Sequence, residues 1–138
     1  WVLSTCLINK IMTLYNLQKR GDRVVLKIHR PAETVKELKT MLTSIEEELI
    51  TSNVRIWIDV TNVKISLIDI KWQIVKEMTH FLNARHLIIN TQVIGCVIVV
   101  NDILSKQIAK LVVGKFIQNV MIVTEADVHK ARTFLREI

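Results

Sequence analysis

Alternating apolar and polar positions predict strands in the first half of the chain. Segment 23–29 places Val24, Leu26 and Ile28 on one side, and segment 54–60 shows the same alternation. An earlier strand over 13–18 is joined to 23–29 by a Lys19–Asp22 turn whose glycine can adopt a positive φ. The pattern therefore predicts a hairpin, 13–18 and 23–29, and then a strand over 54–60.

The second half of the chain contains more continuous apolar runs. Segment 93–100 ends in four consecutive apolar residues, which is typical of a central strand covered on both faces. A shorter strand is predicted over 120–123. Residues 86–92 are ambiguous, since they fit either a helix extension or an irregular lead-in to the strand.

Apolar residues at helical spacing follow each of these later strands and the hairpin. They predict helices over about 33–50, from 66 to about 83, from 103 to Gly114, and over the last residues up to 138. Each helix has a polar residue placed to cap its start. These signals are Thr34-x-x-Glu37, Ser66-x-x-Asp69, Asn101-Asp102 and Thr124-x-x-Asp127.

The predicted order is β-β-α-β-α-β-α-β-α. Strands that alternate with helices favour parallel pairing with right-handed crossovers. The sequence thus predicts an α/β fold with a single mixed sheet, an N-terminal hairpin and repeated strand-helix units, in one domain over 12–138. Residues 1–11 are interpreted as an N-terminal extension of uncertain status.

Composition narrows the class of protein without naming a function. Half of the 138 residues are hydrophobic, which supplies a sizeable core and argues against disorder. The apolar window 87–100 is interrupted by polar residues and is too short to span a bilayer. Cys6 and Cys96 lie far apart and suggest no disulfide framework, so we expect a reducing, cytoplasmic location.

Motifs for catalysis, metals or cofactors are weak or missing in the sequence. Glu77-x-x-His80 puts a carboxylate and an imidazole on one helix face, but a second copy, which carboxylate-bridged metal sites need, does not occur. There is no glycine-rich phosphate loop, nucleophile elbow or zinc-spaced cysteine pair. We therefore predict no enzyme activity, no cofactor and no metal site.

The element order resembles the STAS domain, the fold of anti-sigma-factor antagonists and of sulfate-transporter tails. The segment MTLYNLQKRGDRVVLKIHRPAETVKELKTML is similar to the opening hairpin and first helix of that family. RIWIDVTNVKISLIDIKWQI resembles its signature strand, loop and helix, and NVMIVTEADVHKARTFL its last strand and helix. The resemblance covers nearly all of 12–138, is closest to the SpoIIAA-like branch, and implies a regulatory or scaffolding domain that binds a protein partner.

One departure from that family concerns its phosphorylation switch. Typical antagonists carry Asp-Ser-x-Gly at the start of the helix after the signature strand, and the aligned positions here are 67–70, Leu-Ile-Asp-Ile. The serine and glycine are missing in register. Ser66 lies just before and is the candidate phosphorylation site, although an ordinary helix cap is the simpler interpretation.

A partner-binding site is predicted where the parallel strands end. Open α/β sheets place their binding sites at the carboxyl ends of the strands. Trp57 is added as an aromatic anchor, provided that no helix covers its face of the sheet. The candidate residues are Trp57, Thr61, Asn62, Ser66, Asp69, Asn101, Asp102 and Thr124.

Two other function classes remain open. The formal net charge of +6 allows a nucleic-acid-binding accessory domain, with paired cations on two helices and around the hairpin turn, although only 5% of the chain is aromatic. These cations are Lys106 and Lys110, Arg132 and Arg136, and Lys19, Arg20 and Arg23. A small-ligand or lipid carrier is the other class, motivated by the apolar core. A homodimer also stays an open alternative.

Overall fold

The computed structural model describes residues 14–51, 53–63 and 71–138. Two of the predicted site residues, Ser66 and Asp69, lie outside the described residues, as does the N-terminal extension 1–11.

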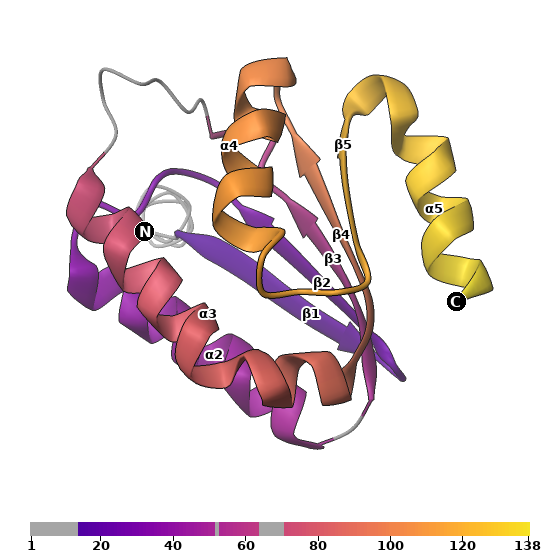
Figure 1. Cartoon of the computed structure of the whole chain (residues 1–138), viewed down its shortest axis with the longest axis horizontal. Coiled ribbons are helices and arrows are strands. Elements are labelled where there is room, and N and C mark those ends of the chain that lie inside the picture. The colour runs from indigo at the N-terminus through magenta and orange to yellow at the C-terminus, as the bar shows by residue number, and fades with distance from the viewer. Residues whose placement is uncertain (1–13, 52, 64–70) are drawn as a thin grey trace, which may run out of the picture.

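A single five-stranded mixed sheet organises the molecule (Figure 1). The strands lie side by side in chain order, with β1 and β2 antiparallel and every later pair parallel. The α/β fold class predicted from the sequence is therefore confirmed. The strands are β1 (Tyr15–Arg20), β2 (Arg23–Ile28), β3 (Val54–Asp59), β4 (Val93–Val100) and β5 (Val120–Thr124).

Helices connect the strands after the hairpin, as the apolar spacing predicts. A short 3₁₀ turn, η1 (Glu125–Asp127), leads directly into the last helix. The helices are α2 (Val35–Thr51), α3 (Trp72–Gln92), α4 (Ile103–Val113) and α5 (Val128–Glu137). None of the helices among the described residues is long and apolar enough to cross a membrane.

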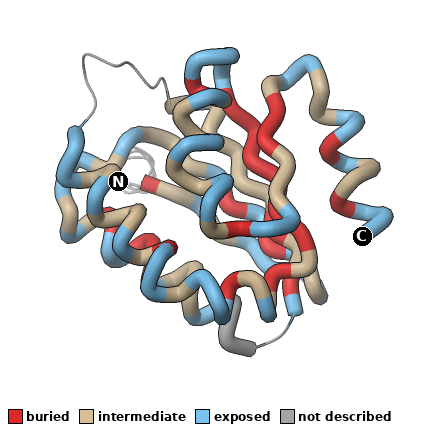
Figure 2. The backbone as a smooth tube through the Cα atoms, in the orientation of Figure 1, coloured by how far each residue is buried: buried red, intermediate tan, exposed pale blue. Residues whose placement is uncertain are grey.

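The main core lies between one face of the sheet and the helices α2, α3 and α4. Val24, Ile56 and Ile98 point into it from neighbouring strands and are at most 6% exposed. Leu38 and Met41 of α2 bury against the side chains of α3, and Leu38 is only 1% exposed. Figure 2 shows the buried segments concentrated along the sheet and the inner sides of these helices.

On the opposite face of the sheet, α5 is the one helix of the described residues that packs against the strands. Ala131 and Leu135 pack on Val97, Val99 and Val123 of the two last strands. The helix approaches so closely at Gly95 that an added Cβ would lie 2.8 Å from Ile138 Cδ1. A glycine at the start of β4 therefore lets the end of α5 rest on the sheet backbone.

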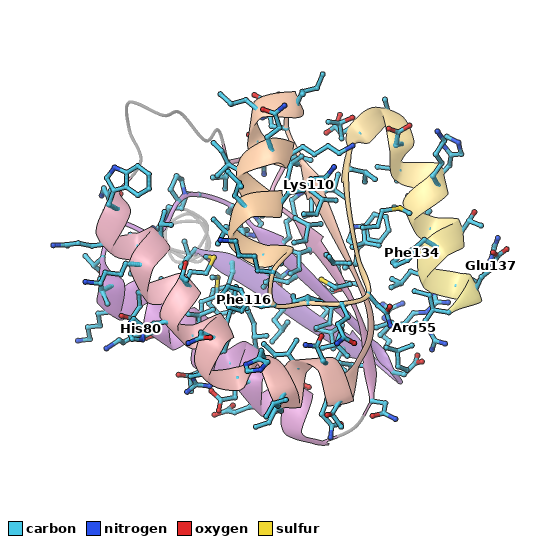
Figure 3. The ribbon with its side chains drawn as sticks, viewed as in Figure 1. Arg55, His80, Lys110, Phe116, Phe134 and Glu137 are labelled. Atoms are coloured by element: carbon cyan, nitrogen blue, oxygen red, sulfur yellow. The ribbon has the colours of Figure 1, made fainter. Side chains whose placement is uncertain are left out.

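Arg55 attaches the end of α5 to the hairpin. Its Nε donates to Leu135 O at 3.1 Å and its Nη2 to Ile138 O at 2.9 Å, while Nη1 pairs with the Asp22 carboxylate. The last carbonyl groups of a helix have no N–H donor within the helix, so the Arg55 guanidinium supplies donors to two of them. Its positive charge also suits the negative end of the helix dipole. Figure 3 shows Arg55 beneath the last turn of α5.

Helix α3 is longer at its carboxyl end than the sequence predicts. It continues to Gln92 instead of ending near residue 83, so the ambiguous segment 86–92 is a helix extension. The Asn90 side chain donates to Phe116 O at 2.8 Å and accepts from Gln118 N at 2.9 Å. These contacts with the α4–β5 connection hold the added turns in place. At its other end α3 begins at Trp72, and Lys71 before it makes no side-chain cap.

The other predicted caps are partly confirmed. Glu37 N donates to Thr34 Oγ1 at 3.1 Å, but the Glu37 carboxylate accepts from Glu33 N because Arg30 holds it there. Thr124 makes no side-chain cap, so that prediction was wrong: the 3₁₀ turn separates it from α5. In the hairpin the strands extend to Arg20 and Arg23, which leaves a two-residue turn with Gly21 at φ 61°.

Candidate functional site

The carboxyl ends of β3, β4 and β5 meet at one edge of the sheet, together with the start of α4 and of η1. In Figure 1 this is the upper edge of the molecule. Five of the predicted site residues lie here, and two exposed apolar residues join them. We call this surface the carboxyl rim, and it comprises Thr61, Asn62, Asn101, Asp102, Ile103, Leu104 and Thr124.

Hydrogen bonds fix the loop that follows β3. Asp59 Oδ1 accepts from Thr61 N at 2.9 Å and from Thr61 Oγ1 at 2.6 Å. An aspartate that binds the backbone two residues on stabilises a turn. Asn62 at the tip of this turn is left exposed.

A second contact joins this loop to the one after β4. Asn101 Nδ2 donates to Thr61 O at 2.8 Å, and Val60 N donates to Val99 O at 2.9 Å. Two loops that are 40 residues apart in the sequence thus form one continuous polar surface. The structure brings Thr61 and Asn101 together as the sequence predicts.

The start of α4 combines a polar cap with exposed apolar side chains. Asp102 Oδ1 accepts from Ser105 N at 2.8 Å, which confirms the predicted cap. Ile103 and Leu104 follow at once and are 71% and 42% exposed. Their helical spacing indicated an apolar helix but could not tell which side faces solvent, so sequence reasoning missed them as site residues.

Thr124 and Trp57 have different surroundings. Thr124 pairs in register with Val100, so it ends its strand beside the start of the Asn101 loop. Trp57 lies on the other face of the sheet, half-buried against the cluster beneath α5. Helix α5 therefore covers part of its ring, and its role in partner binding stays a prediction.

Titratable groups in the described residues do not converge on a catalytic arrangement. Burial raises the pKa of the Cys96 thiol to about 12, so it stays protonated and behaves as a small apolar side chain. Glu77 pairs with Lys39 at 3.7 Å, while His80 is exposed. No group of three histidine, cysteine, aspartate or glutamate side chains in this part of the chain could hold a metal ion.

A charged hydrogen-bonded pair lies away from the rim, at the start of α2. The Arg30 guanidinium donates to Glu37 at 3.1 and 2.5 Å and, with the Glu33 amide, lowers the pKa of that carboxyl from 4.5 to about 2. This ion pair joins Arg30, which precedes α2, to Glu37 in the first turn of that helix. An open depression of about 580 Å³ nearby is lined by Val35 and by lysine and hydroxyl side chains of α2, and its lining contains no carboxylate or imidazole.

The rim therefore offers a fixed polar surface with an exposed apolar centre, without a converging acid, base or nucleophile among its described residues. The sequence matches no protein-family model and no curated protein.

Proposed function

We propose that this protein is a non-catalytic interaction domain, STAS-like in its element order, that binds a protein partner through the carboxyl rim. The regulatory or scaffolding role that the resemblance implies would be exerted through that contact. The single observation that carries the proposal is the Asn101–Thr61 hydrogen bond of 2.8 Å, which joins two loops into one surface beside the exposed Ile103.

The chemistry of the rim suits a protein partner. Interfaces place apolar side chains at their centre and hydrogen-bonding groups around them. Ile103 and Leu104 supply the centre, while Asn62 and Asn101 lie exposed beside it. Because the loops are held by internal hydrogen bonds, little ordering is required when a partner binds, which favours affinity.

Affinity capture with matched variants tests the proposal. The protein, immobilised and exposed to nuclease-treated lysate of its source, is compared with Ile103→Glu and Asn62→Ala, and retained proteins are identified by mass spectrometry. The control is Leu111→Glu, which places the same charge on the same helix at a residue 69% exposed but near its far end.

The expected result is a discrete partner whose retention falls at least about fivefold with Ile103→Glu, the size of loss that interface anchors show. Asn62→Ala should weaken it less, and Leu111→Glu should leave it unchanged. Equal retention by all variants, or equal loss with the Leu111 control, would show that the rim is not the binding surface.

A further inference from the structure

On the face of the sheet that carries α5, the strands β1 and β2 lie beyond that helix and form an exposed, cationic surface within the described chain. On this face β1 contributes Asn16, Gln18 and Arg20, because Leu17 between them packs into the core on the other side. The adjacent β2 contributes Arg23, Val25 and Lys27, all exposed, between the buried Val24 and Leu26. We call these six residues the open sheet face.

The register of the strands places these side chains in three rows. Arg20 lies opposite Arg23, Gln18 opposite Val25, and Asn16 opposite Lys27. Neighbouring strands are about 4.8 Å apart and alternate residues about 6.7 Å apart along each strand. The open sheet face is therefore a regular grid of polar groups with cations in its first and last rows.

The three cations of this grid have no ionic partner in the described chain. Arg20, Arg23 and Lys27 make none of the salt bridges found there, whereas Lys19 on the opposite face pairs with Glu48 at 3.4 Å. Arg55 continues the first row beyond Arg23, but Asp22 and the α5 carbonyls occupy its guanidinium. Asp59 continues the last row beyond Lys27, and its Oδ1 accepts hydrogen bonds from Thr61. The face thus carries positive charge that the fold itself does not use.

The composition of the face favours a nucleic acid over a protein segment. A protein helix or strand docking here would need an apolar centre, and Val25, 43% exposed, is the one aliphatic side chain of the grid. A polyanion needs only cations and hydrogen-bond donors that follow its backbone. A duplex is usually read by an element inserted into a groove, whereas a single strand can lie flat on a sheet.

We propose that the open sheet face binds the sugar-phosphate backbone of single-stranded nucleic acid. Arg20, Arg23 and Lys27 neutralise phosphates, and Asn16 and Gln18 donate hydrogen bonds between them. Because the aromatic ring that borders the face in the described chain, Trp57, is half-buried, the binding is electrostatic and insensitive to base sequence. This surface lies on the sheet face and is separate from the carboxyl rim.

Fluorescence anisotropy with labelled 20-nucleotide poly-dT and poly-U tests the proposal. Three contacted phosphates predict that the logarithm of the association constant falls with that of salt at a slope of about −2. A fourfold rise in salt should then weaken binding about 16-fold. The Arg23→Gln/Lys27→Gln variant should reduce the slope to about −0.7 and abolish most binding at moderate salt.

The matched control removes the same charge elsewhere. Lys76→Gln/Lys110→Gln changes two exposed lysines on the helical side of the molecule, and Figure 3 shows Lys110 on α4. Both double variants alter exposed side chains, so circular dichroism and thermal melting should match those of the parent. The control should bind the oligonucleotides within about twofold of the parent.

Several outcomes would overturn the proposal. They are no binding of either oligonucleotide at low salt, equal loss in both double variants, or a 20-base-pair duplex bound as tightly as the single strands. Poly-glutamate of matched length binding as tightly, and failing with the same variant, would instead assign the face to an acidic protein segment. Preference for poly-U over poly-dT would identify RNA as the natural strand.

Discussion

The two faces of the sheet are built in opposite ways. One face is sealed by three helices and holds a continuous apolar core from Val24 to Ile122. On the other face the ten-residue helix α5 covers β4 and β5 and reaches Trp57 of β3, while β2 presents Arg23, Val25 and Lys27 to solvent. Most of the apolar burial that stabilises the fold thus lies on one face. Part of the other face stays exposed and can contact a ligand.

Leu38→Ala should have the largest effect and tests where the stability lies. Leu38 is 1% exposed between α2, α3 and the sheet, so the truncation should lower the free energy of unfolding by about 3 kcal/mol through lost burial and a cavity. Val25→Thr on the open sheet face should change it by less than about 0.5 kcal/mol. Denaturant unfolding measures both, and similar losses would erase the difference between the faces.

Arg55→Ala tests how the smaller face is held. It removes the pair with Asp22 and the hydrogen bonds to Leu135 and Ile138, and should lower the free energy of unfolding by about 2 kcal/mol. Hydrogen exchange should accelerate in α5 before it does in α2 or α3. Arg23→Ala, its exposed neighbour in register, is the control. Unchanged exchange in α5 would show that Arg55 does not hold the helix.

Gly95→Ala tests the close approach of α5. The new methyl group would lie 2.8 Å from Ile138 Cδ1 and 3.3 Å from Leu135 Cδ1. Because Ile138 Cδ1 is the end of a flexible side chain that can shift, a cost of at most about 1 kcal/mol is expected. The same substitution in an Ile138→Ala background should cost less, because the nearest obstacle is gone. An equal cost in both backgrounds, measured by thermal unfolding, would contradict this contact.

Glu37→Gln has the smallest expected effect and concerns the sealed face. The folded-state pKa of about 2 lies below the ordinary 4.5, so the carboxylate stabilises the fold above about pH 4.5. That contribution is lost as the pH falls toward about 2. The melting temperature of Glu37→Gln should therefore fall less between these pH values than that of the parent or of Glu47→Gln. Parallel pH curves would refute the assignment.

The sequence predicts the sealed face better than the open one. Strong alternation in β2 and β3 fixes which side chains enter the core, and helical spacing fixes the inner positions of α3 such as Met78. Local signals fail where distant residues decide the outcome. Arg55 contacts residues 80 positions away, and the last turns of α3 depend on Asn90 reaching the α4–β5 connection.

The candidate site, too, could be predicted from the sequence only in part. Chain order places Thr61 and Asn101 at one sheet edge, and their hydrogen bond follows from parallel pairing of β3 and β4. Exposure of Ile103 and Leu104 could not be predicted, because an apolar residue in the first turn of a helix fits either side. The open sheet face could not be predicted either, because the sequence does not show how many strands α5 covers.

Solvent paramagnetic relaxation of valine methyl groups measures the exposure of the two sheet faces separately, since adjacent valines of β2 lie on opposite faces. A soluble paramagnetic agent should strongly broaden the methyl signals of Val25, which is 43% exposed, and should leave those of Val24 and Val97, at 2% and 0%, protected. Protection of Val25 equal to that of Val24 would mean that the face is covered, and would contradict an open cationic half of the sheet.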